Sequence, residues 1–324
     1  MLIGNHLDLK TEYSVGALLY TPAINENISR DIIEEKFGRR YSLALCLEDA
    51  ISDDIVGIAE NTVIKTVQRL YEEKKEYYKP LLFVRVRTPE QLASIHERLK
   101  DYYQILDGYI FPKYSLDNAD AYNNLMKKIN ENSQHCVYMM PILESGEIAD
   151  YCSRHSSLIK LKEKIDEVKE YVLNIRVGGN DFSNYFRVRR HVDETIYDIL
   201  PIAQLLSDIL STFSKDYVVS GPVWEYFNGD DEKWKIGLEK EIKRDVLNGF
   251  IGKTVIHPKQ IAVVNEGLAV LKDDYEDART ILEWNNESLG VEKSASGERM
   301  NERKTHTNWA RKMVALAELY GIKE

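Results

Sequence analysis

Short apolar runs alternate with longer amphipathic segments along most of the chain. Runs of strand length predict eight strands, over residues 16–22, 42–47, 81–87, 108–113, 137–143, 171–177, 216–222 and 252–258. Apolar residues three and four positions apart predict helices over residues 25–37, 52–78, 119–130, 196–213, 231–248 and 261–271. Another helix is expected to begin at Pro89, because the missing N–H of proline costs least in a first turn.

This alternation predicts the fold class. Strand and helix follow one another with no compositional break, no internal repeat and no low-complexity tract. Strands joined by helices pair in parallel, and eight such units favour a closed (β/α)8 TIM barrel, an α/β fold. An open doubly wound sheet is the alternative that the periodicity leaves open. In both folds, ligands bind at the carboxyl ends of the strands.

The character of the chain changes after Leu271. The remaining pattern predicts two helices with a polar loop between them, over residues 273–284, 309–320 and 285–307. Gly321 suits the end of the last helix. We therefore expect residues 1–271 to form a TIM-barrel catalytic domain. Residues 272–324 would form a helical tail that packs on the barrel or on a neighbouring subunit.

Composition indicates a folded protein with a negative net charge. Of the 324 residues, 44% are apolar, which is enough for a core, and 30% are charged. The 43 Lys and Arg against 53 Asp and Glu give a net charge of −10. That charge argues against nucleic acid and against an anionic membrane surface as partners. It leaves room for a local basic pocket that binds a small anionic substrate.

The cysteines and the amino-terminal residues bear on the compartment. Cys46, Cys136 and Cys152 are odd in number and lack the spacing of a metal site, which is typical of reduced thiols in a cytosolic protein. Residues 1–12 contain no long apolar core, so we expect no signal peptide. No apolar run is long enough to span a bilayer. We therefore expect a cytoplasmic protein.

Two predicted strands are followed by a carboxylate. Small residues come after the first carboxylate and before the second. Glu144 follows the apolar run 137–143, and Asp181 follows the run 171–177 after two glycines and an asparagine. Carboxylates at the carboxyl ends of barrel strands would converge, and hard oxygen ligands suit Mg2+, whose octahedron water and substrate can complete. Alternatively, Glu144 and Asp181 could cap the helices that follow them.

Further charged residues fall at the same predicted face of the barrel. Glu48 and Asp49 follow the second strand, Arg85 lies in the third, and Lys113 follows the fourth. A site with two carboxylates, a metal and several cations suits an anionic substrate, whose carboxylate Arg85 could bind bidentately. Arg85 could instead pair with a buried carboxylate such as Asp49. Lys113 is a weaker candidate for binding substrate.

Other basic residues have two interpretations each. A cluster lies just past Asp181 and consists of Arg187, Arg189, Arg190 and His191. Arg187 and its neighbours could bind a phosphate of the substrate, or the cluster could be a solvated run of charge. His257, which precedes a proline, is better explained by a structural hydrogen bond than by catalysis.

Six short motifs occur in an order that resembles a known family. They are Leu47-Glu48-Asp49-Ala50, Val84-Arg85-Val86, Pro112-Lys113, Ile142-Leu143-Glu144, Gly179-Asn180-Asp181 and Gly252-Lys253-Thr254-Val255-Ile256-His257-Pro258-Lys259-Gln260-Ile261. Together they resemble the citrate lyase β-subunit-like branch of the HpcH/HpaI aldolase superfamily, from about Leu18 to the last helix. The chain is also similar to a narrower group, the citrate-lyase-like proteins that accompany tellurium-resistance and stress operons.

The resemblance implies a TIM barrel that makes or cleaves carbon–carbon bonds with Mg2+. By position, Glu144 and Asp181 would be the metal ligands. Arg85 would grip the substrate carboxylate, and Glu48 and Asp49 would hold water or orient Arg85, so these three are the expected catalytic residues. Family members often act on acyl-CoA thioesters and are commonly trimers or hexamers. We therefore expect a homo-oligomeric lyase or aldolase that acts on a 2-oxo acid or an acyl-CoA thioester.

Some positions depart from the family pattern. Arg87 stands where an asparagine is common, Tyr114-Ser115 replaces Val-Glu, and Asn180 replaces an acidic residue. In the tail, Asn301 replaces an aspartate that in some relatives reaches a neighbour's active site, and an amide cannot act as a base. Asn301 and Arg87 favour an alternative function: a barrel that keeps the metal and anion pocket but only binds a metabolite or a partner protein.

Overall fold

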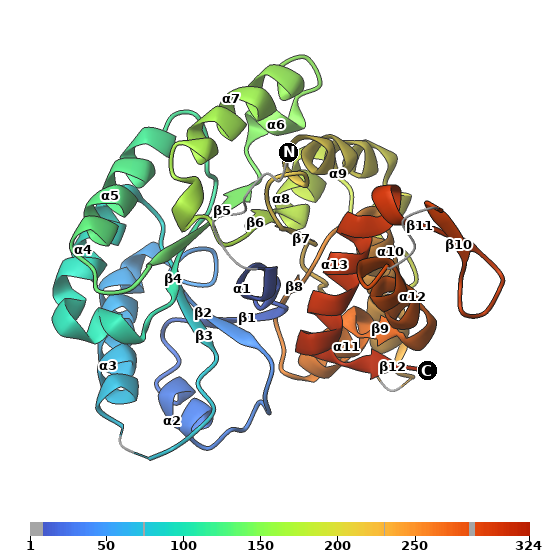
Figure 1. Cartoon of the computed structure of the whole chain (residues 1–324). Helices are drawn as coiled ribbons and strands as arrows, with labels where there is room; N and C mark the ends of the chain where they lie inside the picture. Colours follow the sequence, from blue (N-terminus) through green and yellow to red (C-terminus); the bar gives the residue numbers. More distant parts are fainter. Residues whose placement is uncertain (1–8, 74, 230, 285–288) are drawn as a thin grey trace.

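Eight short parallel strands form the centre of the computed structural model, which describes residues 9–73, 75–229, 231–284 and 289–324 (Figure 1). The strands are β1 (Ala17–Pro22), β2 (Ser42–Cys46), β3 (Leu81–Arg85), β4 (Gly108–Phe111), β5 (Tyr138–Leu143), β6 (Ile175–Val177), β7 (Val219–Ser220) and β8 (Lys253–Val255). From β1 to β7, strands that are neighbours in sequence pair in parallel, and β8 pairs in parallel with β1. The edge strands β7 and β8 are linked by a parallel bridge between Gly221 and Lys253. The predicted TIM barrel is confirmed, and the alternative fold, an open doubly wound sheet, is not observed.

Helices lie outside this barrel and connect its strands (Figure 1). They are α2 (Ile28–Ile33), α3 (Val56–Glu72), α4 (Pro89–Leu99), α5 (Ala119–Glu131), α6 (Gly146–Ala149), α7 (Arg154–Asp166), α8 (Gly179–Phe186), α9 (Leu200–Phe213), α10 (Lys233–Asn248) and α11 (Lys259–Leu268). As expected, α4 begins at Pro89, and the Thr88 side chain caps it by accepting a hydrogen bond from Gln91 N. None of the helices in the described ranges combines the length and the apolar content that crossing a membrane requires.

The predicted elements differ from the observed ones mainly at their ends. Helix α3 ends at Glu72 rather than near residue 78, because the backbone becomes extended at Glu73. Beyond it, Tyr77 donates a hydrogen bond to Leu70 O, and Tyr78 N donates one to Glu35. The strand expected over residues 171–177 pairs regularly only at its end, since a 3-10 turn occupies its start. Helix α7 was not predicted, because its apolar residues are few among many charges.

The barrel interior changes from apolar to polar along the strands. Side chains at alternate positions of a strand point to the same side. Accordingly, Leu18 in β1 and Phe83 in β3 belong to an apolar interior cluster. Two residues further on, Tyr20 and Arg85 line a cavity at the carboxyl ends of the strands. The apolar layer closes the barrel from below, and the polar layer above it forms the floor of that cavity.

The tail packs against the barrel within the same chain. It comprises β9 (Val270–Leu271), α12 (Lys272–Leu282), β10 (Val291–Lys293), β11 (Met300–Glu302), α13 (Arg303–Tyr320) and β12 (Ile322–Lys323). Helix α13 contacts α11 and α12 and reaches the amino-terminal helix α1 (Leu9–Tyr13), where Tyr320 donates a 2.5 Å hydrogen bond to Tyr13 O (Figure 1). Contact with a neighbouring subunit, and the division at residue 271, remain predictions.

The expectation of a loop over residues 285–307 was wrong in part. Strands β10 and β11 pair there as an antiparallel hairpin, and α13 begins at Arg303, earlier than expected. Residues 285–288 of that segment lie outside the described residues. The hairpin is held to α12 by ion pairs from Arg299 to Asp274 and Asp277. These contacts between separate segments are not visible in local periodicity.

A buried ion cluster ties α10 to the barrel. Lys253 of β8 is 1% exposed, and its Nζ lies 2.8 Å from Glu241 and 2.7 Å from Asp245. Glu241 and Asp245 are four residues apart, so both carboxylates project from one face of α10. The ammonium balances the charge of Asp245, which would otherwise be buried without a cation.

Replacing Lys253 by methionine should therefore destabilise the protein. The substitution leaves the buried Asp245 without its cation, whereas Glu241 keeps its ion pair with Arg190. Removing one partner of a buried pair costs about 3–5 kcal/mol. Urea denaturation would measure this loss. Lys243→Met, at an exposed position of the same helix, is the control and should change the free energy of unfolding by less than about 0.5 kcal/mol. Equal stabilities of the two variants would contradict the structural role of Lys253.

Candidate functional site

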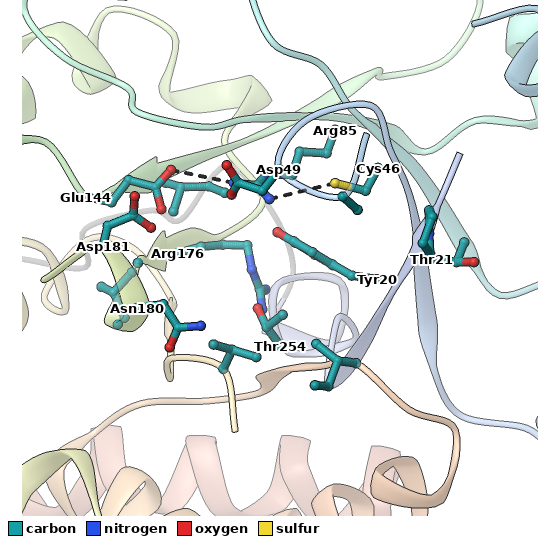
Figure 2. Close-up of a pocket in the computed structure, with 18 residues that line it drawn as sticks. Tyr20, Thr21, Cys46, Asp49, Arg85, Glu144, Arg176, Asn180, Asp181 and Thr254 are labelled. Atoms are coloured by element: carbon teal, nitrogen blue, oxygen red, sulfur yellow. Dashed lines mark hydrogen bonds and ion pairs between the residues drawn. The ribbon is translucent and has the colours of Figure 1, made fainter. Parts of the chain in front are cut away.

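A cavity of 340 Å³ opens at the carboxyl ends of the barrel strands. Its polar and charged lining residues, labelled in Figure 2, are Tyr20, Thr21, Cys46, Asp49, Arg85, Glu144, Arg176, Asn180, Asp181 and Thr254. They come from segments spread over most of the chain. The barrel brings them together because all of its parallel strands end on the same face.

Glu144 is the first residue after β5 and is 7% exposed. Its Oε1 accepts a 2.8 Å hydrogen bond from the backbone N–H of Lys113, whose φ of 50° lies in the left-handed region. Burial, and after it the charge of Asp181, raises the pKa of Glu144 to about 8. Figure 2 shows the carboxylates of Glu144 and Asp181 pointing toward each other.

Of these two acids, Glu144 precedes the N-cap residue of α6 and does not cap that helix, whereas Asp181 lies where a carboxylate interacts favourably with the dipole of α8. No side-chain cap hydrogen bond forms at the start of α6 or α8, and Glu144 bonds instead to the β4–α5 loop. Asp181 lies in the first turn of α8, which begins directly after Gly178. A Cβ atom on Gly178 would lie 2.2 Å from Glu144 Oε2, so a residue without a side chain is needed where β6 ends.

Arg85 is surrounded by carboxylates. Its Nη2 lies 2.6 Å from Glu48, 3.2 Å from Asp49 and 3.7 Å from Glu144, and the side chain is 7% exposed. Its Nη1 contacts Cys46 Sγ at 3.7 Å, and its guanidinium lies over the ring of Tyr20. The predicted pairing of Arg85 with Asp49 therefore exists, and the three predicted catalytic residues lie together.

The other predicted substrate-binding residues lie further out. Lys113 Nζ lies 2.8 Å from Glu48 Oε1, but its side chain is 54% exposed and does not line the cavity. Arg187 is exposed at the carboxyl end of α8 and is not among the lining residues. Arg190 is buried and pairs with Glu241, so the basic cluster does not act as one unit. Roles for Lys113 and Arg187 in binding substrate remain predictions.

Arg87, which departs from the family pattern, and His257, which precedes a proline, both make structural contacts. Arg87 donates hydrogen bonds to Leu47 O, Ile51 O and Asp53, and so holds the loop that carries Glu48 and Asp49. His257 accepts a hydrogen bond from Lys259 N and stacks on Phe227, which matches its structural interpretation.

Asn301 is 2% exposed and lies in the tail, outside the cavity lining. Its side-chain amide donates a 2.9 Å hydrogen bond to Asp277. Within this chain, Asn301 therefore stabilises the packing of the hairpin on α12.

Tyr20, Arg176 and Thr254 are among the lining residues that sequence reasoning missed. Arg176 is 2% exposed and donates a 2.7 Å hydrogen bond to Thr254 Oγ1 across the barrel. Burial raises the pKa of Tyr20, so its hydroxyl remains protonated at neutral pH. An arginine within the otherwise apolar strand β6 was the signal that could have identified Arg176.

The donor set suits a hard divalent cation. Among the described residues, no group of three or more His, Cys, Asp and Glu side chains is arranged as a metal site. However, Mg2+ typically uses only one or two carboxylates and retains water or substrate oxygens. Glu144 and Asp181 provide two, and their mutual repulsion in a buried pocket is what a cation would relieve. The residues present therefore fit Mg2+.

A family model described as "C-C_Bond_Lyase of the TIM-Barrel fold" matches residues 9–322. The chain belongs to this family. The expected enzyme class, a carbon–carbon lyase, is thereby confirmed. Because the match spans nearly all of the chain, it includes both the barrel and the tail.

Solved structures of similar fold are described as citrate lyases. A citrate lyase from Burkholderia xenovorans LB400 has a TM-score of 0.69 at 11% identity, over 98% of this chain and 94% of that one. CitE from Mycobacterium tuberculosis, in complex with magnesium, acetoacetate and coenzyme A, has a TM-score of 0.60 at 18% identity, over 95% and 99%. A citrate lyase β subunit from M. tuberculosis with oxaloacetate and magnesium has a TM-score of 0.51 at 17% identity, over 80% and 99%. Such identities establish a shared fold.

One curated protein matches over a short segment. Carboxylesterase 5A of Canis lupus familiaris is 28% identical over 67 residues, which is 20% of this chain and 12% of that protein. The chain thus covers about an eighth of that relative's length, and the match says nothing about the activity of the barrel.

Replacing Gly178 by alanine should disturb the site. The added Cβ would displace the Glu144 carboxylate, and we expect a loss of about 1–3 kcal/mol in the free energy of unfolding, together with weaker Mg2+ binding. Urea denaturation and calorimetric titration would measure the two effects. Gly57→Ala is the control, because a Cβ there meets no atom within 4 Å. Wild-type behaviour of Gly178→Ala in both measurements would show that Glu144 does not need this space.

Glu144 should make the stability of the Mg2+-free protein depend on pH. With a pKa of about 8 in the folded state against an ordinary 4.5, the folded protein holds a proton that the unfolded chain releases. The stability contributed by this group is therefore full below pH 4.5 and is lost as the pH rises through about 8. Glu144→Gln should remove this dependence, worth as much as about 5 kcal/mol, and should be more stable than wild type at high pH. Urea denaturation at several pH values would measure the free energy of unfolding of both proteins. The same pH dependence in wild type and Glu144→Gln would contradict the raised pKa of Glu144.

Proposed function

We propose that the protein is a Mg2+-dependent carbon–carbon lyase or aldolase that acts on a carboxylate-bearing substrate. The observation that carries the proposal is the pair of carboxylates, Glu144 and Asp181, facing each other in a buried cavity beside Arg85 (Figure 2). Membership of the carbon–carbon bond lyase family supports the reaction class. Glu144 and Asp181 would hold Mg2+, which would stabilise the negative charge that develops on the substrate as the bond breaks.

The surrounding residues would orient the substrate. Glu48 and Asp49 hold Arg85 in place from one side, which leaves its guanidinium facing the cavity. Arg85 would pair there with a substrate carboxylate. Tyr20 provides a protonated hydroxyl in the same cavity and can donate a hydrogen bond to a substrate oxygen. Arg87 positions the loop that carries Glu48 and Asp49, and so acts through them.

The substrate would be a 2-oxo acid or an acyl-CoA thioester. Structural relatives are described with oxaloacetate, or with acetoacetate and coenzyme A, together with magnesium. Exposed Lys113 and Arg187 would then contact the outer part of a long substrate such as a thioester. A cytoplasmic homo-oligomer, either a trimer or a hexamer, is part of the same proposal.

Removing either carboxylate should abolish both metal binding and turnover. We expect Glu144→Gln and Asp181→Asn each to lower Mg2+ affinity at least about tenfold and turnover by at least about a hundredfold, because each removes one of two charged ligands. Calorimetry would measure Mg2+ binding, and release of pyruvate or oxaloacetate from 3-hydroxy acids and CoA esters would measure turnover. Asp54→Asn, at an exposed position near the same loop, is the matched control.

The same experiment separates the alternative, non-catalytic function. If wild-type protein binds Mg2+ through Glu144 and Asp181 but cleaves none of these compounds, a barrel that only binds a metabolite or a partner is the better explanation. If Glu144→Gln and Asp181→Asn bind Mg2+ as wild type does, the proposed metal ligands are wrong.

A further inference from the structure

The cavity contains a second arginine, Arg176, which is buried without a counter-ion. It lies on β6 with 2% of its surface exposed, and its Nη2 donates to Thr254 Oγ1. Its Nε and Nη1 have no hydrogen-bond partner, and it forms no ion pair with a carboxylate of the described residues. Two N–H-bearing nitrogens of a buried cation are therefore unsatisfied at the floor of the cavity.

The two arginines of the cavity differ in how their charge is balanced. Arg85 lies within 4.0 Å of Glu48, Asp49 and Glu144. Arg176 has the neutral hydroxyls of Thr254 and Tyr20 beside it, and the charge of Arg85, which also acts on it, has the same sign (Figure 2). A guanidinium does not lose its proton in a protein, so the charge of Arg176 cannot be relieved by titration. The cavity thus has one cation whose charge carboxylates balance and one cation without an anionic partner among the described residues.

A purely structural role explains Arg176 poorly. Linking β6 to β8 through Thr254 uses a single donor, whereas a buried unpaired charge costs several kcal/mol. Other buried arginines of the chain are compensated: Arg154 pairs with Asp208 and donates to two backbone carbonyls. Only a ligand that enters the cavity can offer Arg176 an anionic partner of this kind, since no described residue does.

We propose that Arg176 binds a second anionic group of the substrate and thereby makes the site selective for small dianions. This inference rests on the proposed function, because it assigns the substrate class of the same cavity. One anionic end would lie beside Arg85, Glu144 and Asp181, and the other would lie on the floor at Arg176. The volume of 340 Å³ is near the lower end of the range for small-molecule sites, roughly 300–1,000 Å³, which suits a compact diacid.

The affinity test uses three stable 2-hydroxy acids as probes, with Mg2+ present. Lactate has one anionic group, malate has a second carboxylate, and 3-phosphoglycerate has a phosphate in its place. We expect at least one of the two dianions to bind wild-type protein about tenfold or more tightly than lactate, because an added charge-assisted contact contributes about 1.5–3 kcal/mol. The dianion that binds more tightly identifies the second group as carboxylate or phosphate.

Substitutions at Arg176 test whether this residue provides the selectivity. Arg176→Met should lower the affinity for the preferred dianion to that of lactate and leave lactate binding unchanged, whereas Arg176→Lys, which keeps the charge, should retain part of the preference. The proposal is overturned if wild-type protein binds the three acids equally or binds none of them. It is also overturned if Arg176→Met lowers the affinity for all three acids by the same factor. If Arg176→Met does not fold, the same criterion applies to Arg176→Lys.

Thermal unfolding without ligand provides a second readout. Arg176→Met removes an uncompensated charge and should raise the melting temperature, whereas Arg154→Met breaks a buried ion pair and should lower it. A melting temperature that falls equally in both variants would show that Arg176 is structural. Arg176-dependent dianion binding without turnover would refute the lyase activity alone, and turnover without dianion selectivity would refute this inference alone.

Discussion

Two like charges held close together in a buried pocket are the constraint on which the site depends. Glu144 and Asp181 repel each other, and burial adds to the cost, so the pKa of Glu144 rises to about 8. The fold holds the arrangement through a backbone hydrogen bond from Lys113 and through the absence of a side chain at Gly178. A site of this kind is costly without a ligand and gains stability when a cation binds. The folding free energy that offsets this repulsion is recovered as binding free energy when the metal binds.

Charge balance differs from one side of the cavity to the other. On the side of β2 and β3, Arg85 forms ion pairs with Glu48 and Asp49, and Arg87 holds the loop that carries these two acids. On the side of β6, Arg176 is buried without such a partner. The acids around Arg85 hold its guanidinium in one position at the cavity, whereas the absence of such a partner leaves the charge of Arg176 available to an anion. Rigid barrel strands allow both arrangements within one small cavity.

Buried charges outside the cavity are paired with one another within the chain. Lys253 and Arg190 balance the charges of Asp245 and Glu241 on α10, and Arg154 balances Asp208 between α7 and α9. These clusters lie outside the cavity and are complete within the chain. The tail adds Asn301 and Arg299, both bonded to Asp277. An amide at position 301 is therefore compatible with folding.

Local sequence patterns determined the order of strands and helices, the barrel, and the positions of Glu144, Asp181 and Arg85 at strand ends. They did so because strand and helix periodicities are local, and because parallel strands must end on one face. Only the tertiary structure decided which charges meet. The engagement of Arg85 by three carboxylates, the exposure of Arg187, the unpaired state of Arg176 and the hairpin in the tail depend on contacts between residues far apart in the chain. The partners of a side chain depend on how distant segments pack together, so they cannot be predicted from the local sequence around it.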